Sequence, residues 1–190
     1  VAAGAATYAA TTATDRAAST TTSTDGYVEV AIGNDGTAGT ATVTLTAGTI
    51  TVSKSVTFTG AAASYSLTGL TGAYAVGATA GTNDSLTAGG IKVKGLDSSG
   101  NAAASGSFWA KSSNTAVATV SGSSHDVSST SGGKTAGTSF VAVTGVSTGK
   151  ATITIQNTDP AGTTAPTVTK TIDIQVTKSV VNSVALSDRK

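Results

Sequence analysis

The sequence has no cysteine, no methionine and one histidine, and only 11% of its 190 residues are charged, against about 25% in ordinary soluble domains. Without cysteine, neither a disulfide framework nor a thiolate metal site can form. A single histidine cannot build a histidine-based metal cluster. Eleven basic residues against ten acidic ones give no basic field for a polyanion, so nucleic acid is not an expected partner. No apolar run approaches the roughly 18 residues of a membrane span, so no membrane-spanning segment is predicted.

Threonine, alanine, serine and glycine dominate what is present, and strong helix formers other than alanine and lysine are scarce. Apolar residues alternate with polar ones in many short runs, which is the pattern of strands with one buried face and one wet face. These runs cover residues 28–32, 41–46, 52–58, 91–94, 151–155 and 172–176. Turn signals such as Asp25-Gly26 and Asp159-Pro160-Ala161-Gly162 lie between them. The sequence therefore predicts an all-β fold of β-sandwich type with essentially no helix.

An internal repeat indicates how the chain is divided. Residues 39–45 align with 149–155, and residues 52–58 align with 168–174, which is a spacing suited to one sandwich domain of about 100 residues. The repeat predicts a complete domain at residues 61–177. It predicts that residues 1–60 are the C-terminal part of a similar domain whose opening strands are missing, and that 178–190 are a linker or the start of a next domain. The alternative for residues 1–24 is a flexible linker with no fold.

Three segments carry a family resemblance. The run Phe108–Ser121 resembles the tryptophan–serine–asparagine segment of bacterial Ig-like domains, and Thr148–Ile155 resembles their closing strand. Val93–Asn101 is similar to the Asp-x-x-Gly-Asn turn of the related invasin- and intimin-like domains. The resemblance implies tandem Ig-like β-sandwich domains, the first incomplete, in a surface-layer or other cell-surface protein. It implies an extracellular location, with copies of itself in a lattice or filament, or neighbouring Ig-like domains of a longer chain, as partners.

The same turn supplies the best candidate for a metal site. Asp97, Ser99 and Asn101 occupy alternating positions, as at the start of a calcium loop, but the later glutamate and the sixth-position glycine of an EF-hand are missing. The alternative is a hairpin turn held by Asx hydrogen bonds. We expect no cofactor other than this possible Ca²⁺.

Two motif matches point weakly to catalysis, and we expect no enzyme. Gly145–Gly149 fits the G-x-S-x-G pattern of a nucleophile elbow, but a strand follows it where that elbow needs a helix. Gly133-Lys134-Thr135 has the end of a phosphate-binding loop but not its first glycine or a following helix. His125 lies beside Asp126 in a loop, and neighbours in sequence do not converge as a triad must, so we expect an exposed loop histidine.

Four further residues carry specific expectations. Trp109, the single tryptophan, is expected to fill the centre of the sandwich. Asn83 begins an Asn-Asp-Ser glycosylation sequon whose use the sequence does not decide. Lys54 and Lys170 hold equivalent places in the last strand of each repeat and share the parity of its inward apolar residues. Because an inward lysine guards against edge-to-edge pairing, we expect both strands at a sheet edge with the ammonium in solvent.

Composition and repeat together predict a structural role. Small uncharged side chains are cheap to desolvate and lose little rotamer entropy, and a net charge near zero favours association. The absence of methionine and cysteine also removes the main targets of oxidation in an exposed protein. The favoured function is therefore a structural component of an extracellular assembly, a surface layer or filament built of Ig-like domains. The alternative is an adhesin stalk or an accessory binding module of a secreted cell-wall or polysaccharide enzyme.

Overall fold

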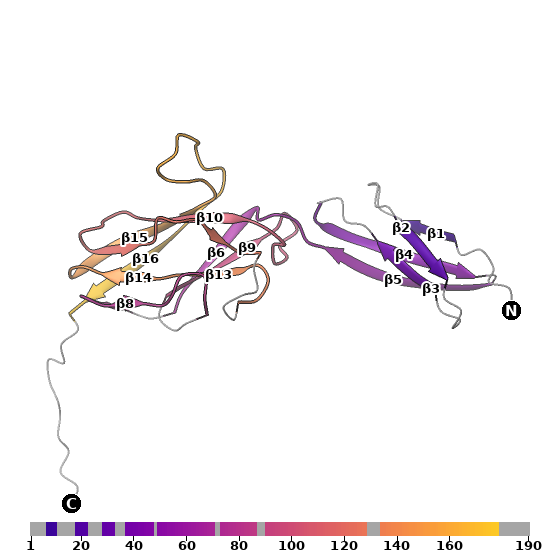
Figure 1. Ribbon diagram of the computed structural model, residues 1–190, viewed down its shortest axis with the longest axis horizontal. Helices are drawn as coiled ribbons and strands as arrows, with labels where there is room; N and C mark the ends of the chain where they lie inside the picture. The colour runs from indigo at the N-terminus through magenta and orange to yellow at the C-terminus, as the bar shows by residue number, and fades with distance from the viewer. Residues whose placement is uncertain are drawn as a thin grey trace, which may run out of the picture.

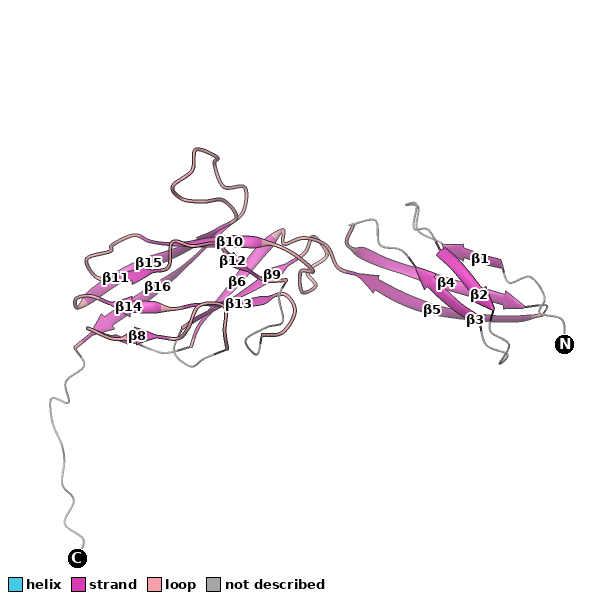
Figure 2. Ribbon diagram, viewed as in Figure 1, coloured by secondary structure: helices cyan, strands magenta, loops and turns pink. Residues whose placement is uncertain are grey.

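The computed structural model describes residues 7–10, 18–22, 28–32, 37–47, 49–70, 73–86, 90–128 and 134–178. Every regular element in this part of the chain is a β-strand, which confirms the predicted all-β fold (Figures 1 and 2). No helix in these ranges is long and apolar enough to cross a membrane. The predicted linker or next domain at residues 178–190 lies outside the described residues apart from Lys178.

The first part of the chain forms two small sheets. β4 (Gly39–Ala47) pairs with β5 (Ile50–Phe58) in a long antiparallel hairpin, and β1 (Thr7–Ala10) adds to the other side of β4. β2 (Ala18–Thr22) and β3 (Val28–Ile32) form a separate two-stranded ribbon. Within the stretch 1–24, for which a flexible linker was the alternative, the described residues 7–10 and 18–22 are strands. The assignment of residues 1–60 to a domain that lacks its opening strands stays a prediction.

The second part is a two-layer sandwich. One layer has the strand order β12-β10-β15-β16-β7, and the other combines β13-β9-β6 with β11-β14-β8. The strands are β6 (Ser64–Gly69), β7 (Tyr74–Ala75), β8 (Thr79–Ala80), β9 (Ile91–Leu96), β10 (Ser107–Ser112), β11 (Ala118–Val120), β12 (His125–Asp126), β13 (Thr138–Val141), β14 (Val143–Gly145), β15 (Gly149–Gln156) and β16 (Thr169–Thr177).

One hydrophobic core lies between these two layers. It is built by the inward members of the alternating runs, among them Ile91 and Val93 of β9, Phe108 of β10, and Ile153 and Ile155 of β15. All five are 0% exposed. Trp109 is not in this core, contrary to expectation. Successive side chains of a strand face opposite sides of the sheet, so the inward position of Phe108 leaves Trp109 half-buried on the other face.

The two lysines lie where the sequence predicted. β5 is the edge strand of its sheet, and Lys54 is exposed. β16 pairs with β15 along its length, but β7 covers its other side only at Val176 and Thr177, so this side is unpaired at Lys170, which is also exposed. The predicted edge positions and exposed side chains of both lysines are confirmed, and their guard role stays a prediction.

Candidate functional site

The predicted calcium turn lies between β9 and the following loop, and Asp97 is its centre. The Asp97 carboxylate is 3% exposed. Its Oδ1 accepts hydrogen bonds from the backbone N–H groups of Ser99 and Asn101, both at 2.9 Å. Its Oδ2 accepts the N–H of Gly60 at 3.2 Å. The backbone closes the turn, because the N–H of Asp97 donates to the Asn101 carbonyl at 2.9 Å.

These contacts favour the hairpin alternative over a calcium site. Burial alone would raise the pKa of the Asp97 carboxyl, but hydrogen bonds from the backbone of Asn101, Gly60 and Ser99 hold that pKa below its usual value. Amide protons stabilise a carboxylate as a cation would, so both oxygens are already directed at positive groups. Within the described ranges, no three His, Cys, Asp or Glu side chains gather as a metal site would require. Calcium binding through Asp97, Ser99 and Asn101 stays a prediction.

His125 is buried, which corrects the expectation of an exposed loop residue. It lies on the short strand β12 and is 1% exposed. Its ring stacks on Phe108, with ring centres 5.0 Å apart. The pairing of β12 with β10 brings this about, because it sets His125 opposite Phe108 at the end of the core. The Gly/Ser-rich composition around His125 concealed a strand of two residues.

His125 belongs to a polar cluster centred on Asp84, whose side chain is 38% exposed, while those of His125 and Lys134 are buried. The His125 Nδ1 atom lies 3.1 Å from Asp84 Oδ2, and the Ser139 hydroxyl donates to Asp84 Oδ1. The Lys134 ammonium lies 3.9 Å from Asp84 Oδ1 and donates to the Asp126 carbonyl at 3.0 Å. The cluster therefore joins the turn at Asp84 to residues 125–139, which lie more than 40 positions later in the sequence. In a chain without cysteine it is a non-covalent staple.

The geometry of this cluster does not make it a catalytic triad. A serine nucleophile needs a base within hydrogen-bonding distance, whereas here Ser139 and His125 both turn toward the same carboxylate. Asp126, the sequence neighbour of His125, points elsewhere and accepts hydrogen bonds from Ser128. Burial would raise the pKa of Asp126, but the Ser128 hydrogen bonds and the nearby Lys134 charge lower it below the usual value.

The two motif matches lie in the structural contexts that the sequence predicted. Ser147 sits in the turn between β14 and β15, where its hydroxyl donates to the Ala116 carbonyl at 2.6 Å, and strand β15 follows directly. Thr135 is followed by strand β13, and the Lys134 side chain is buried in the cluster around Asp84. Neither segment has the helix that its motif requires.

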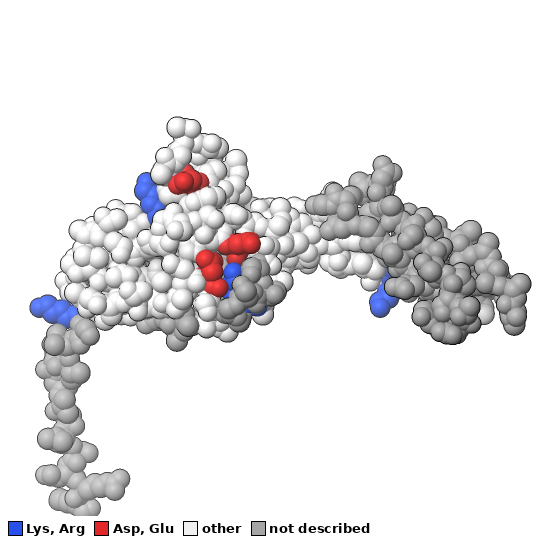
Figure 3. Space-filling model, viewed as in Figure 1, with Lys and Arg blue, Asp and Glu red and all other residues white. Residues whose placement is uncertain are grey.

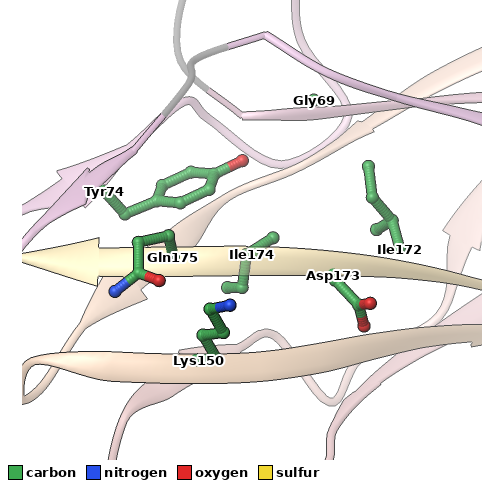
Figure 4. A pocket seen from close by; sticks show the side chains of 7 residues that line it. All are labelled: Gly69, Tyr74, Lys150, Ile172, Asp173, Ile174 and Gln175. Carbon is green, nitrogen blue, oxygen red and sulfur yellow. The ribbon is translucent and has the colours of Figure 1, made fainter.

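A shallow groove of about 260 Å³ lies over β16. It is lined by Gly69, Tyr74, Lys150 and residues 172–175, and Figure 4 shows Tyr74 lying over Ile174. The Tyr74 hydroxyl is buried without a hydrogen-bond partner among the described residues, and burial raises its pKa. The groove is smaller than the roughly 300–1,000 Å³ of typical ligand pockets.

Sequence reasoning missed three of these residues. Asp84 had one signal, because the Asn83-Asp84 pair is turn-forming and Asp84 adopts a left-handed φ of 53°. Asn83 itself is exposed, and its Oδ1 accepts the Ala142 N–H at 2.8 Å. Lys134 and Tyr74 carry no local signal, since only the tertiary fold brings them to buried positions.

No known family model matches the sequence, and no curated protein matches it. Among solved structures, the chain is similar to surface layer protein SbsC, domains 1–6, at 22% identity and a TM-score of 0.42, over 93% of this chain and 20% of that one. It is similar to the Yersinia pseudotuberculosis protein InvD at 17% identity and a TM-score of 0.44, over 98% and 51%. A β-glycosidase from Bacteroides vulgatus matches at 14% identity and a TM-score of 0.43, over 80% and 19%. These likenesses add nothing to the all-β architecture that the strand pairing establishes.

Proposed function

We propose that this chain is a structural component of an extracellular assembly, a surface layer or filament whose repeating unit is an Ig-like β-sandwich. The observation that carries the proposal is the low charge of the chain, in which only 11% of the residues are charged. Figure 3 shows charged atoms only in small, separated groups on the face drawn, among the described residues. The whole chain has a formal net charge of +1 at pH 7.

Hydroxyl groups on neighbouring strands satisfy one another across this surface. Thr44 bonds to Ser53 at 2.9 Å, and Thr79 bonds to Thr144 at 2.7 Å. Side chains fixed in this way lose little entropy when a neighbouring subunit covers them. They also need no charge partner on the other subunit. Such faces suit close packing between copies.

The alternative is a stalk in which the domains act only as spacers for an adhesive tip. Close lateral packing would then be unnecessary. Carbohydrate recognition by the chain itself is less favoured, because Trp109 is half-buried on the outer face and the sequence has only eight aromatic residues in all. We further propose that the chain has no catalytic activity, since its one histidine holds a structural carboxylate.

Negative-stain electron microscopy of the purified chain, with and without Ca²⁺, tests the proposal. We expect regular sheets or filaments, with specific contacts burying about 800 Å² per partner. Single elongated particles at all concentrations would favour the stalk. Retention on insoluble cell-wall polysaccharide would favour the accessory binding module.

A further inference from the structure

The segment that leaves the first part of the chain, Gly60–Ala63, is hydrogen-bonded to the second domain. The Gly60 N–H donates to Asp97, and the Gly60 carbonyl accepts from the Ala104 N–H at 2.8 Å. The Ala62 N–H donates to the Ser105 carbonyl at 2.9 Å, and the Ala63 N–H donates to the Leu96 carbonyl at 2.7 Å. The linking segment is therefore built into the sandwich before β6 begins at Ser64.

The packing around Ala62 shows that the sandwich has a complementary site for residues 60–63. Ala62 is partly buried against the core and lies beside two glycines. A Cβ atom at Gly106 would stand 2.8 Å from the Ala62 Cβ, and one at Gly95 would stand 3.3 Å from it. The absence of side chains at these two glycines makes the room that Ala62 occupies. Ala61, between the seated residues, is exposed.

We propose that the Asp97 hairpin is an inter-domain clasp, which seats residues 60–63 and so fixes the direction in which the preceding domain leaves. The first part ends its last strand at Phe58, and the first seated residue is Gly60. Thr59 is the one residue between them, so the joint is short. The Asp97 turn then has a mechanical role in place of the calcium role predicted for it.

This inference deepens the proposed function. The purpose of the clasp rests on that function, because a surface layer or filament needs its units held at a set angle. The clasp itself rests on the contacts above and can be tested on dilute, unassembled protein. A chain that fails to assemble but keeps a stiff joint would count against the proposed function alone.

The lack of native cysteine allows two spin labels to be placed cleanly, at Ser55→Cys in β5 and Thr171→Cys in β16, which are both exposed. We expect pulsed electron paramagnetic resonance to give a narrow distance distribution in the labelled parent. Asp97→Ala should broaden it by releasing Gly60. Ala62→Val should broaden and shift it, because the larger side chain does not fit between the glycines. Ala61→Val is the matched control and should leave it narrow.

A parent distribution as broad as that of the variants would overturn the clasp. So would narrow distributions in both Asp97→Ala and Ala62→Val while Trp109 fluorescence shows the second domain folded. Amide hydrogen exchange of the unaltered chain gives a second test should a variant fail to fold. The Gly60, Ala62, Ala63 and Ala104 amides should exchange slowly, and exchange at the rate of an unstructured peptide would contradict the proposal.

Discussion

The β4–β5 and β15–β16 hairpins are sequence repeats that lie in different surroundings. Ile153 in β15 is 0% exposed, whereas its equivalent in β4, Val43, is only half-buried. Val52 in β5 is 61% exposed, whereas its equivalent Val168 packs against the core of the second domain. The alternating pattern thus determines which residues share a face and how the strands pair. Whether that face is buried depends on a second layer, which covers the inward residues of β15 and the C-terminal end of β16.

The largest effect should separate the two hairpins directly. Ile153→Ala should cost about 2–5 kcal/mol of unfolding free energy, as truncation of a fully enclosed side chain does. Val43→Ala, at the equivalent place, should cost about 1 kcal/mol or less, because its surroundings already admit water. Urea unfolding can be followed by Trp109 fluorescence for the second domain and by circular dichroism for the whole chain. Equal losses at the two positions would show that the first hairpin is as well covered as the second.

The next effect tests the staple around Asp84, which has no counterpart among the described residues of the first part. Asp84→Ala removes the common partner of His125, Ser139 and Lys134, and, because Asp84 is 38% exposed, should destabilise the second domain by about 1–3 kcal/mol. Asp159→Ala is the control, because Asp159 is exposed on a loop and bonds only within its own turn. A loss of unfolding free energy no larger than that of Asp159→Ala would show that the cluster around Asp84 does not staple the domain.

The pH dependence should follow the carboxylates of the second domain. The folded-state pKa values of Asp97 and Asp126 are lowered from an ordinary value of 3.8. A lowered pKa means that the charged form stabilises the fold. This stability is fully present above the unfolded value near 3.8 and is lost as pH falls through the folded values.

Urea midpoints measured by Trp109 fluorescence should therefore hold steady near neutral pH and fall below about pH 4. Asp97→Asn and Asp126→Asn should each reduce the fall of the urea midpoint at acid pH. A midpoint that rises on acidification would contradict the hydrogen-bonding role assigned to both residues.

The smallest effect on stability concerns the edge lysines, which the two parts share. Lys54→Val and Lys170→Val should change unfolding free energy by less than about 0.5 kcal/mol, because both side chains are exposed. Both should nevertheless increase aggregation, since each removes a charge from an open strand edge. Lys94→Val makes the same change of charge on β9, where exposed Lys94 is paired with both β6 and β13, and should aggregate less. Light scattering on heating measures the difference, and equal aggregation of all three variants would reject the guard role.

Particular residues show which features of the fold can be predicted from the sequence. The alternation of Ile153 and Ile155 with threonine predicted a strand and its inward face, and both are observed. The parity of Lys170 predicted a sheet edge for the same reason, because alternation is a local property of the chain.

The environments of His125 and Trp109 could not be predicted in this way. His125 is buried because β12 pairs with β10, and Trp109 faces outward because Phe108 occupies the inward position beside it. Both outcomes depend on pairings between distant segments. The role of Asp97 was half predicted, since the turn is local but its bond to Gly60 spans 37 residues.

The central claim, that the chain is made to pack against copies of itself, is tested most directly by sedimentation velocity over a wide range of concentration. The experiment needs the purified chain at neutral pH, with Ca²⁺ and with chelator. The account predicts that the sedimentation coefficient rises with concentration and that large, uniform species form. A monodisperse monomer at the highest concentration under both conditions would contradict it and leave the spacer role of a stalk.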